Sequence, residues 1–362
     1  MPNVELIIGG TKHKGWMEIS ITRSLEAVSG AFDLAVTERY PGEQAKRGIS
    51  PGDACRLAVD DEVIITGYVD DVGVRYDARS HRVVFRGRDA TGDLVDCSAI
   101  AHPNHWDADI LTITRAITKD YNIKVSADPS VDVSSRFNGF VLQDGETVFE
   151  TIDRMARTIG VMAVSDGQGG LVFTRAGSAP ANTRLKLGVN ILTGEFRRSH
   201  RQRFSEYRVY AQSAGGQHTD PEASVQINGF AEDPGITRHR PLIVLAEIGT
   251  ISAQNALDRA KWEASVRYGR AWRGVYRVPG WRDAAGKLWR PNSMVEIYDT
   301  LSSIYEPLLI CGVKNETGEN GTTTELTVTR REAFELAPLH KDSEFDRPPR
   351  NSPFRNDGQG LP

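Results

Sequence analysis

The first hundred residues alternate between apolar and polar positions over short stretches that end at turn-forming residues. Such alternation places successive side chains on opposite faces of the chain, which is typical of half-buried β-strands. Asp60 and Asp61 separate two of these stretches and predict a tight hairpin turn. Short strands at this spacing favour a small β-barrel or sandwich. The predicted strands are residues 19–24, 32–38, 55–61, 63–76 and 81–89.

From about residue 97 the apolar residues recur at the three- and four-residue steps of an α-helix. One predicted helix begins at Asp107 or Asp109, and its apolar residues are Ile110, Ile113, Ile117 and Tyr121. A second begins with a capping box of Thr147 and Glu150 and ends at Gly160. Its apolar residues are Val148, Ile152, Met155 and Ile159.

The rest of the chain returns to strand-like patterns, with one further helix. That helix is predicted at about residues 252–268, with a narrow face of alanines and an end at Gly269. From about residue 340 the chain holds Pro, Asp, Arg and Asn with almost no apolar residues. Such a segment cannot bury enough surface to become ordered, so we predict a disordered tail at residues 339–362.

Two distant segments share the same order of features. Each has a leading proline, a short strand, a turn, an apolar strand closing on glycine, and a strand ending in arginine, an acidic residue and alanine. Any two three-stranded meanders share some of these residues, but the shared order favours a repeat. The matched positions are Pro51 with Pro291, Cys55 and Leu57 with Val295 and Ile297, Gly67 with Gly312, Val83 and Phe85 with Leu326 and Val328, and 88–90 with 331–333.

These patterns predict a β-rich α+β chain with two similar small β-barrel domains and additional α+β modules. We expect the first barrel at residues 1–96 and an α+β module at residues 97–180. The second barrel is expected to be discontinuous, built from residues 181–213 and 281–338. A helix-containing module at residues 214–280 would be inserted into it.

Composition and charge narrow the classes of function. The formal net charge is −4, so no global basic charge favours nucleic-acid binding. The sequence contains no apolar run of membrane-spanning length and no secretory signal at its N-terminus. Its 3 cysteines lie far apart, so we expect free thiols in a reducing cytoplasm rather than a disulfide framework.

A search for catalytic or metal-binding residues gives weak candidates. His102, His105 and Asp107 could form a metal cluster, but Pro103 between the histidines and the lack of a supporting helix favour surface histidines. Neighbouring residues on a strand point to opposite faces, whereas the two carboxylates of a glycosidase face each other. We therefore interpret the acidic pairs as one turn and two stretches of solvated charge; they are Asp60-Asp61, Asp70-Asp71 and Glu232-Asp233.

The glycine-rich residues 167–170 lie between two predicted strands, not before a helix, so they do not predict a phosphate-binding loop. A basic stretch is the strongest candidate for an electrostatic contact. Because acidic residues flank it, a solvated strand edge or an acidic protein partner is favoured over a phosphate-binding surface. The basic residues are Arg197, Arg198, His200, Arg201 and Arg203. We assign no catalytic, cofactor-binding or metal-binding residue.

Trp281 and Trp289 flank a polar, glycine-containing stretch. Exposed, they would form a stacking platform for a sugar or a base; buried, they would be hairpin and core residues. Because the following residues match the first strand of the repeat, we favour the buried arrangement. We expect a hairpin that bridges the helical insertion and the second barrel, with both indole N–H groups hydrogen-bonded.

An ordered series of blocks resembles the baseplate hub proteins of Mu-type contractile-tailed phages. Residues 1–338 are covered, and the order of the blocks makes the resemblance specific, although no single block is diagnostic. VgrG proteins of type VI secretion share this hub architecture, with a long C-terminal spike extension that the chain lacks. The blocks are residues 51–99, 140–161, 236–247, 280–299 and 308–314.

The resemblance implies a homotrimer in the virion, at the centre of the tail baseplate, assembled in the host cytoplasm. Two barrels per subunit would make a pseudo-sixfold ring that joins the sixfold tail tube to the threefold central spike, a separate polypeptide. DNA would pass through the channel of the ring in transit. The family also implies other baseplate partners, no cofactor, no small-molecule substrate and no enzymatic activity.

Two other classes of function stay open on the residues alone. A tail-associated cell-wall-degrading enzyme would use carboxylates such as Asp70 or Asp71. A nucleic-acid-binding protein would use the basic stretch from Arg197 to Arg203, and its binding would depend steeply on salt.

Overall fold

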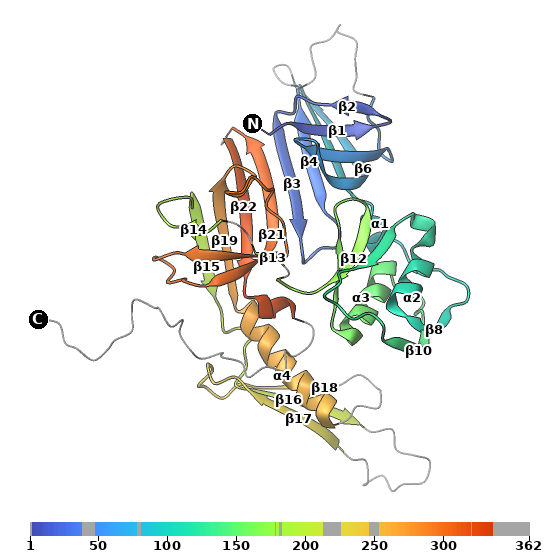
Figure 1. The fold of residues 1–362 in the computed structure, drawn as a ribbon, viewed down its shortest axis with the longest axis vertical. Coiled ribbons are helices and arrows are strands. Elements are labelled where there is room, and N and C mark those ends of the chain that lie inside the picture. Colours follow the sequence, from blue (N-terminus) through green and yellow to red (C-terminus); the bar gives the residue numbers. More distant parts are fainter. Residues whose placement is uncertain are drawn as a thin grey trace, which may run out of the picture.

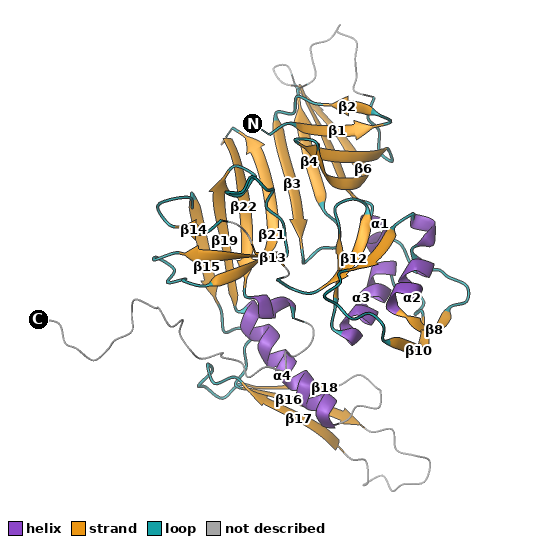
Figure 2. Cartoon of the chain, viewed as in Figure 1, coloured by secondary structure: helices purple, strands orange, loops and turns teal. Residues whose placement is uncertain are grey.

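The computed structural model describes residues 2–37, 48–77, 81–177, 179–180, 183–212, 226–245, 253–319 and 321–335. Among these described residues, strands account for 49% and helices for 16%, which confirms the β-rich α+β class (Figure 2). The predicted disordered tail, residues 339–362, lies outside the described residues. None of the described helices combines the length and apolar character that crossing a membrane requires.

The first barrel is a run of antiparallel strands that curves around one apolar core. Asp60 and Asp61 have φ of 49° and 68° and form the tight turn predicted between its fifth and sixth strands. The strands lie in the order β3-β4-β7-β6-β5-β1-β2. Their bounds are β1 (Val4–Ile8), β2 (Thr11–His13), β3 (Glu18–Ser24), β4 (Ala31–Val36), β5 (Ala54–Val59), β6 (Glu62–Tyr76) and β7 (His81–Asp89).

An α+β module follows and contains both predicted helices, although the first ends at Ile117 and Tyr121 lies in a separate 3-10 turn. Asp109 caps α2 by accepting from the Thr112 N–H at 2.9 Å, and Thr147 with Glu150 forms the capping box of α3. Gly160 ends α3 at φ 73°. The elements are α1 (Gly92–Asp96), β8 (His105–Asp109), α2 (Ile110–Ile117), η1 (Lys119–Tyr121), β9 (Lys124–Ala127), β10 (Arg136–Val141), α3 (Val148–Ile159), β11 (Met162–Ser165) and β12 (Gly170–Thr174).

The second barrel has its own core, and its strands are interrupted along the sequence by a separate sheet. Its main strands lie in the order β15-β19-β22-β21-β20, and the short β13 and β14 pair with β20. The elements are β13 (Ala179–Pro180), β14 (Leu185–Lys186), β15 (Thr193–Arg198), β19 (Trp272–Pro279), β20 (Ser293–Tyr298), β21 (Pro307–Gly318), β22 (Gly321–Thr329) and the 3-10 turn η3 (Arg331–Phe334).

The inserted module is a three-stranded sheet crossed by one long helix (Figure 1). Its elements are β16 (Glu206–Gln212), β17 (Gln226–Glu232), β18 (Pro241–Leu245) and α4 (Ala253–Arg270). Gly269 does not end this helix, contrary to the sequence prediction. A Cβ on Gly269 would lie 2.2 Å from the backbone nitrogen of Ala333, so the glycine allows η3 to pack directly on α4.

Strand pairing divides the second barrel from the insert at other positions than the sequence predicted. β16, within the expected barrel segment 181–213, pairs with β17 and β18. β19, within the expected insert 214–280, pairs with β15 and β22. An alternating strand fits either sheet equally well, and only its partner in space decides. We therefore propose residues 199–271 as the inserted module.

Candidate assembly site between the two barrels

The two barrels repeat the same arrangement of strands. The orders β3-β4-β7-β6-β5 and β15-β19-β22-β21-β20 correspond strand by strand, and every neighbouring pair in both is antiparallel. The inserted module takes the place of the short β3–β4 connection. One chain therefore carries two copies of a five-stranded unit, as the sequence repeat predicted.

A β-bulge fixes the residue-by-residue match between the two units. The register on β6 shifts between Val69 and Asp71, and the register on β21 shifts between Ile310 and Gly312. Since bulges interrupt the pairing at one defined residue, we match Val69 with Ile310 and Asp71 with Gly312. The first-strand match of the sequence repeat survives, because Cys55 pairs with Gly67 and Val295 with Leu308.

The later matches of the sequence repeat were wrong. Gly67 corresponds to Leu308, not to Gly312, and Phe85 corresponds to Leu326, not to Val328. The predicted match of residues 88–90 with residues 331–333 is likewise two residues away from the match that the bulge sets. Residue identity suggested the earlier match, whereas the position of the bulge, which the sequence pattern did not reveal, sets the register.

Strands β3 and β21 join the two barrels into one continuous sheet (Figure 1). They pair antiparallel from Ser24 opposite Gly312 to Ile19 opposite Thr317. Arg273 donates two hydrogen bonds to Glu26 across this seam, at 2.6 and 2.9 Å, and lowers the pKa of the Glu26 carboxyl. The seam is therefore a backbone ladder with a bidentate ion pair beside it.

The tryptophan hairpin lies at this seam, which corrects its predicted place beside the helical insertion. The N–H of Trp289 donates to the carbonyl of Trp281 at 3.1 Å, so the two residues face each other across the hairpin. Trp281 packs into the core of the first barrel, and its indole donates to the Glu316 carbonyl at 3.0 Å. Trp289 packs into the core of the second barrel. Each side chain is 4% exposed, which leaves no stacking face for a ligand.

One part of the tryptophan prediction was wrong. The indole N–H of Trp289 is buried and has no hydrogen-bond partner among the described residues. Ion pairs hold the same hairpin to the β5–β6 turn: Arg282 contacts Asp60 at 2.9 Å and Glu62 at 3.7 Å, and Arg290 also contacts Glu62. Sequence reasoning missed these links, since nothing in the local pattern joins residues more than 200 positions apart.

The acidic pairs are engaged in ion pairs. Asp70 accepts from Arg88 at 2.7 Å and Asp71 from Arg86 at 3.1 Å, both on the surface of the first barrel. The two carboxylates are therefore engaged by two different arginines of β7.

The third acidic pair corrects two predictions. Asp233 is buried, not solvated, and accepts two hydrogen bonds from Arg203 at 2.8 and 2.7 Å. Arg203 therefore belongs to the interior of the inserted module and not to an exposed basic stretch. Arg197 and Arg198 lie instead on β15, the terminal strand of the sheet. The guanidinium of Arg198 lies 4.4 Å from the Trp272 ring centre.

The candidate metal residues do not converge. His102 and His105 are exposed, and Asp107 accepts a hydrogen bond from the Gly139 N–H at 2.6 Å. Within the described ranges, no group of three or more His, Cys, Asp or Glu side chains could hold a metal ion.

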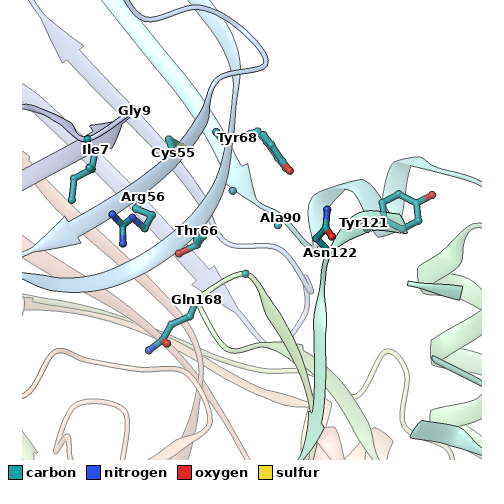
Figure 3. A pocket seen from close by; sticks show the side chains of 14 residues that line it. Ile7, Gly9, Cys55, Arg56, Thr66, Tyr68, Ala90, Tyr121, Asn122 and Gln168 are labelled. Atoms are coloured by element: carbon teal, nitrogen blue, oxygen red, sulfur yellow. The ribbon is translucent and has the colours of Figure 1, made fainter. Parts of the chain in front are cut away.

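A cleft of about 310 Å³ lies between the first barrel and the α+β module (Figure 3). Its lining includes Arg56, Tyr68, Tyr121 and Gln168, and no carboxylate or imidazole is among the lining residues. Burial raises the pKa of the Cys55 thiol to about 12, which keeps it protonated and a poor nucleophile. The cleft therefore contains no acid–base or nucleophilic pair.

Three family models match successive parts of the chain. Residues 3–89 match the N-terminal domain of the Mu phage baseplate assembly protein GpP-like family, and residues 252–337 match the fourth domain of GpP. Residues 91–175 match the second domain of the baseplate hub protein gp44-like family. The baseplate hub protein gp44 of Escherichia phage Mu is 35% identical over 349 residues, covering 94% of this chain and 90% of the relative. The chain belongs to the family of Mu-type phage baseplate hub proteins.

Solved structures share the fold of this baseplate hub protein. The 43 kDa tail protein of prophage MuSo2 from Shewanella oneidensis is 35% identical with a TM-score of 0.82, covering 93% of this chain and all of the other. A chain of the Francisella PdpA–VgrG complex has a TM-score of 0.57 at 7% identity, covering 92% of this chain and 59% of that chain. At this identity the likeness shows the fold alone, and it agrees with the predicted relation to VgrG proteins.

Proposed function

We propose that three copies of this baseplate hub protein assemble into a ring of six barrels at the centre of the phage baseplate. The observation that carries the proposal is the identical strand order of the two barrels, joined by the β3–β21 seam. A chain with two equivalent units can present a nearly sixfold surface as a trimer, because closed symmetric assemblies reuse one interface.

The ring joins the sixfold tail tube to the threefold central spike and surrounds the channel through which DNA is ejected. Its barrels would repeat six times, whereas the α+β module and the inserted module occur once per chain and would repeat three times. This difference supports a role between partners of unlike symmetry. In this proposal the protein resides in the virion, after assembly in the host cytoplasm, and contacts the tube, the spike and other baseplate proteins.

The ring acts mechanically and carries no covalent step. Support comes from the ion-paired carboxylates at Asp70 and Asp71 and from the composition of the cleft. Incubating the purified protein with peptidoglycan tests this part of the proposal. We expect no release of fragments at any pH, and a release that is lost in Asp70→Asn would overturn it.

The oligomeric state is tested by light scattering coupled to size-exclusion chromatography. We expect a mass about three times the 39.9 kDa of the chain, and electron-microscope images with six lobes around a central opening. A strict monomer over a wide range of concentrations would refute the ring.

A further inference from the structure

The second barrel ends in a strand edge that has no partner within the described part of the chain. β15 pairs with β19 on one side, and it is the terminal strand of the sheet. Its residues are exposed apart from Phe196, which is half-buried. An open strand edge offers a row of backbone donors and acceptors for pairing with another strand.

The first barrel carries a matching open edge. β5 covers one side of β6 only as far as Tyr68, opposite Ala54. The remainder of β6, which pairs with β7 alone, exposes two large apolar side chains: Val74 is 57% exposed and Tyr76 is 76% exposed. Large apolar side chains at an open edge mark a surface that a partner covers.

The seam within the chain shows which edges belong together. In the matched strand orders β3 corresponds to β15, and β21 corresponds to β6. β3 pairs with residues 312–317 of β21, its far half. The far half of β6 is the equivalent of that half of β21. β15 and the far half of β6 are therefore the equivalents of the two strands that pair in the β3–β21 seam. Within one chain they do not pair with each other, so both edges are open to a second copy.

The register of the internal seam can be transferred through these equivalences. Ile21 of β3 lies opposite Phe32 of β4, and Phe196 of β15 lies opposite Gly274 of β19. Phe32 and Gly274 correspond, because they pair with equivalent residues of β7 and β22, so Ile21 matches Phe196. The bulge matches Asn315 of β21 with Val74. Since Ile21 lies opposite Asn315, Phe196 would lie opposite Val74.

We propose that β15 of one copy pairs antiparallel with residues 71–76 of β6 in a neighbouring copy, with Phe196 opposite Val74. The same register places Glu195 opposite Arg75 and Gly194 opposite Tyr76. This interface rests on the proposed trimeric ring and names the surface that closes it. Each chain pairs its β15 edge with one neighbour and its β6 edge with the other neighbour. Around the ring, three such contacts between copies alternate with the three β3–β21 seams within the chains.

Side-chain chemistry favours this register over its neighbours. In the proposed register Arg75 and Glu195 lie opposite each other as unlike charges, which stabilises a cross-strand pair. A shift by two residues in one direction would place Arg75 opposite Arg197, two like charges. The exposed apolar Val74 gains the Phe196 ring, and the large Tyr76 lies opposite a glycine that leaves room for its ring.

Disulfide trapping tests the register. In the double variant Val74→Cys/Phe196→Cys, opposite residues are near the separation that a disulfide needs, so mild oxidation should give a covalent trimer on a non-reducing gel. The control is Val72→Cys/Phe196→Cys, whose cysteines lie on the same face but are diagonal, and it should cross-link at least tenfold less. Wild-type protein oxidised in parallel accounts for the 3 native cysteines.

Charge exchange provides a second measurement that needs no cross-link. Arg75→Glu or Glu195→Arg alone should raise the trimer dissociation constant by roughly two- to tenfold per interface, and the double exchange should restore it. A trimer by light scattering that neither cross-links at Val74 and Phe196 nor responds to the exchange would overturn this interface and leave the ring intact. A wild-type monomer would overturn the ring itself.

Discussion

Trp281 and Trp289 form a matched pair for testing how the two barrels are held together. Replacing either by phenylalanine removes part of a buried ring and one indole N–H. At Trp281 that N–H donates to the Glu316 carbonyl at 3.0 Å, whereas at Trp289 it has no partner among the described residues. The same substitution should therefore have different consequences 8 positions apart in the sequence.

The ring loss is common to both variants and costs about 1.6 kcal/mol, taking roughly two CH₂ groups at about 0.8 kcal/mol each. Trp281→Phe also loses a hydrogen bond worth about 1 kcal/mol, so we expect a total loss of about 2–3 kcal/mol. Trp289→Phe removes a buried donor whose desolvation costs about 1–3 kcal/mol, which offsets the ring loss. We expect its free energy of unfolding within about 1 kcal/mol of wild type.

Urea unfolding followed by far-ultraviolet circular dichroism measures both variants. Protein concentration must be the same throughout, because assembly shifts apparent stability. We expect a lower midpoint for Trp281→Phe with an unchanged slope. Equal losses in the two variants, or a larger loss at Trp289, would refute the assignment of the two indoles.

Three further predictions concern other contacts of the fold. Asp233→Ala should destabilise the inserted module by about 3–5 kcal/mol in thermal unfolding, because it leaves Arg203 buried and unpaired. Lys12 and Lys14 lower the pKa of Glu5 to about 2, so the stability Glu5 contributes is complete above about pH 4.5 and lost as the pH falls toward 2. Glu5→Gln should therefore lose less stability than wild type between pH 5 and pH 2 in acid unfolding. Gly269→Ala should lower the melting temperature by several degrees, because its methyl group would displace η3 from α4.

Matched controls accompany these variants. Arg208→Ala breaks the ion pair with Glu206, in which the arginine side chain is 46% exposed. This variant should lose less than about 1 kcal/mol of unfolding free energy. Gly318→Ala meets no atom closer than 3.9 Å and should leave the melting temperature nearly unchanged. Parallel acid-unfolding curves for wild type and Glu5→Gln, equal effects of the two glycine substitutions, or an Asp233→Ala loss as small as the Arg208→Ala loss would each contradict the contact concerned.

Local patterns in the sequence were sufficient for the helix starts, the hairpin turn and the existence of the repeat, but not for its residue-by-residue register. The capping box at Thr147 and the cap at Asp109 follow from side chains that bond backbone groups within three residues, and the turn at Asp60 follows from a residue type that tolerates positive φ. Alternation found most strands of both barrels, and the ordered features found the repeat. These signals succeed because the interactions behind them are short in sequence.

Only the tertiary structure decided which strands are partners and what is buried. β16 and β19 alternate alike, yet they lie in different sheets, because pairing depends on strands distant in sequence. The sequence pattern placed Arg203 in an exposed basic stretch, whereas in the structure it is buried and paired with Asp233, 30 positions away. The open edges of β15 and β6 are likewise invisible in the sequence, since an edge is defined by the partner that a strand lacks.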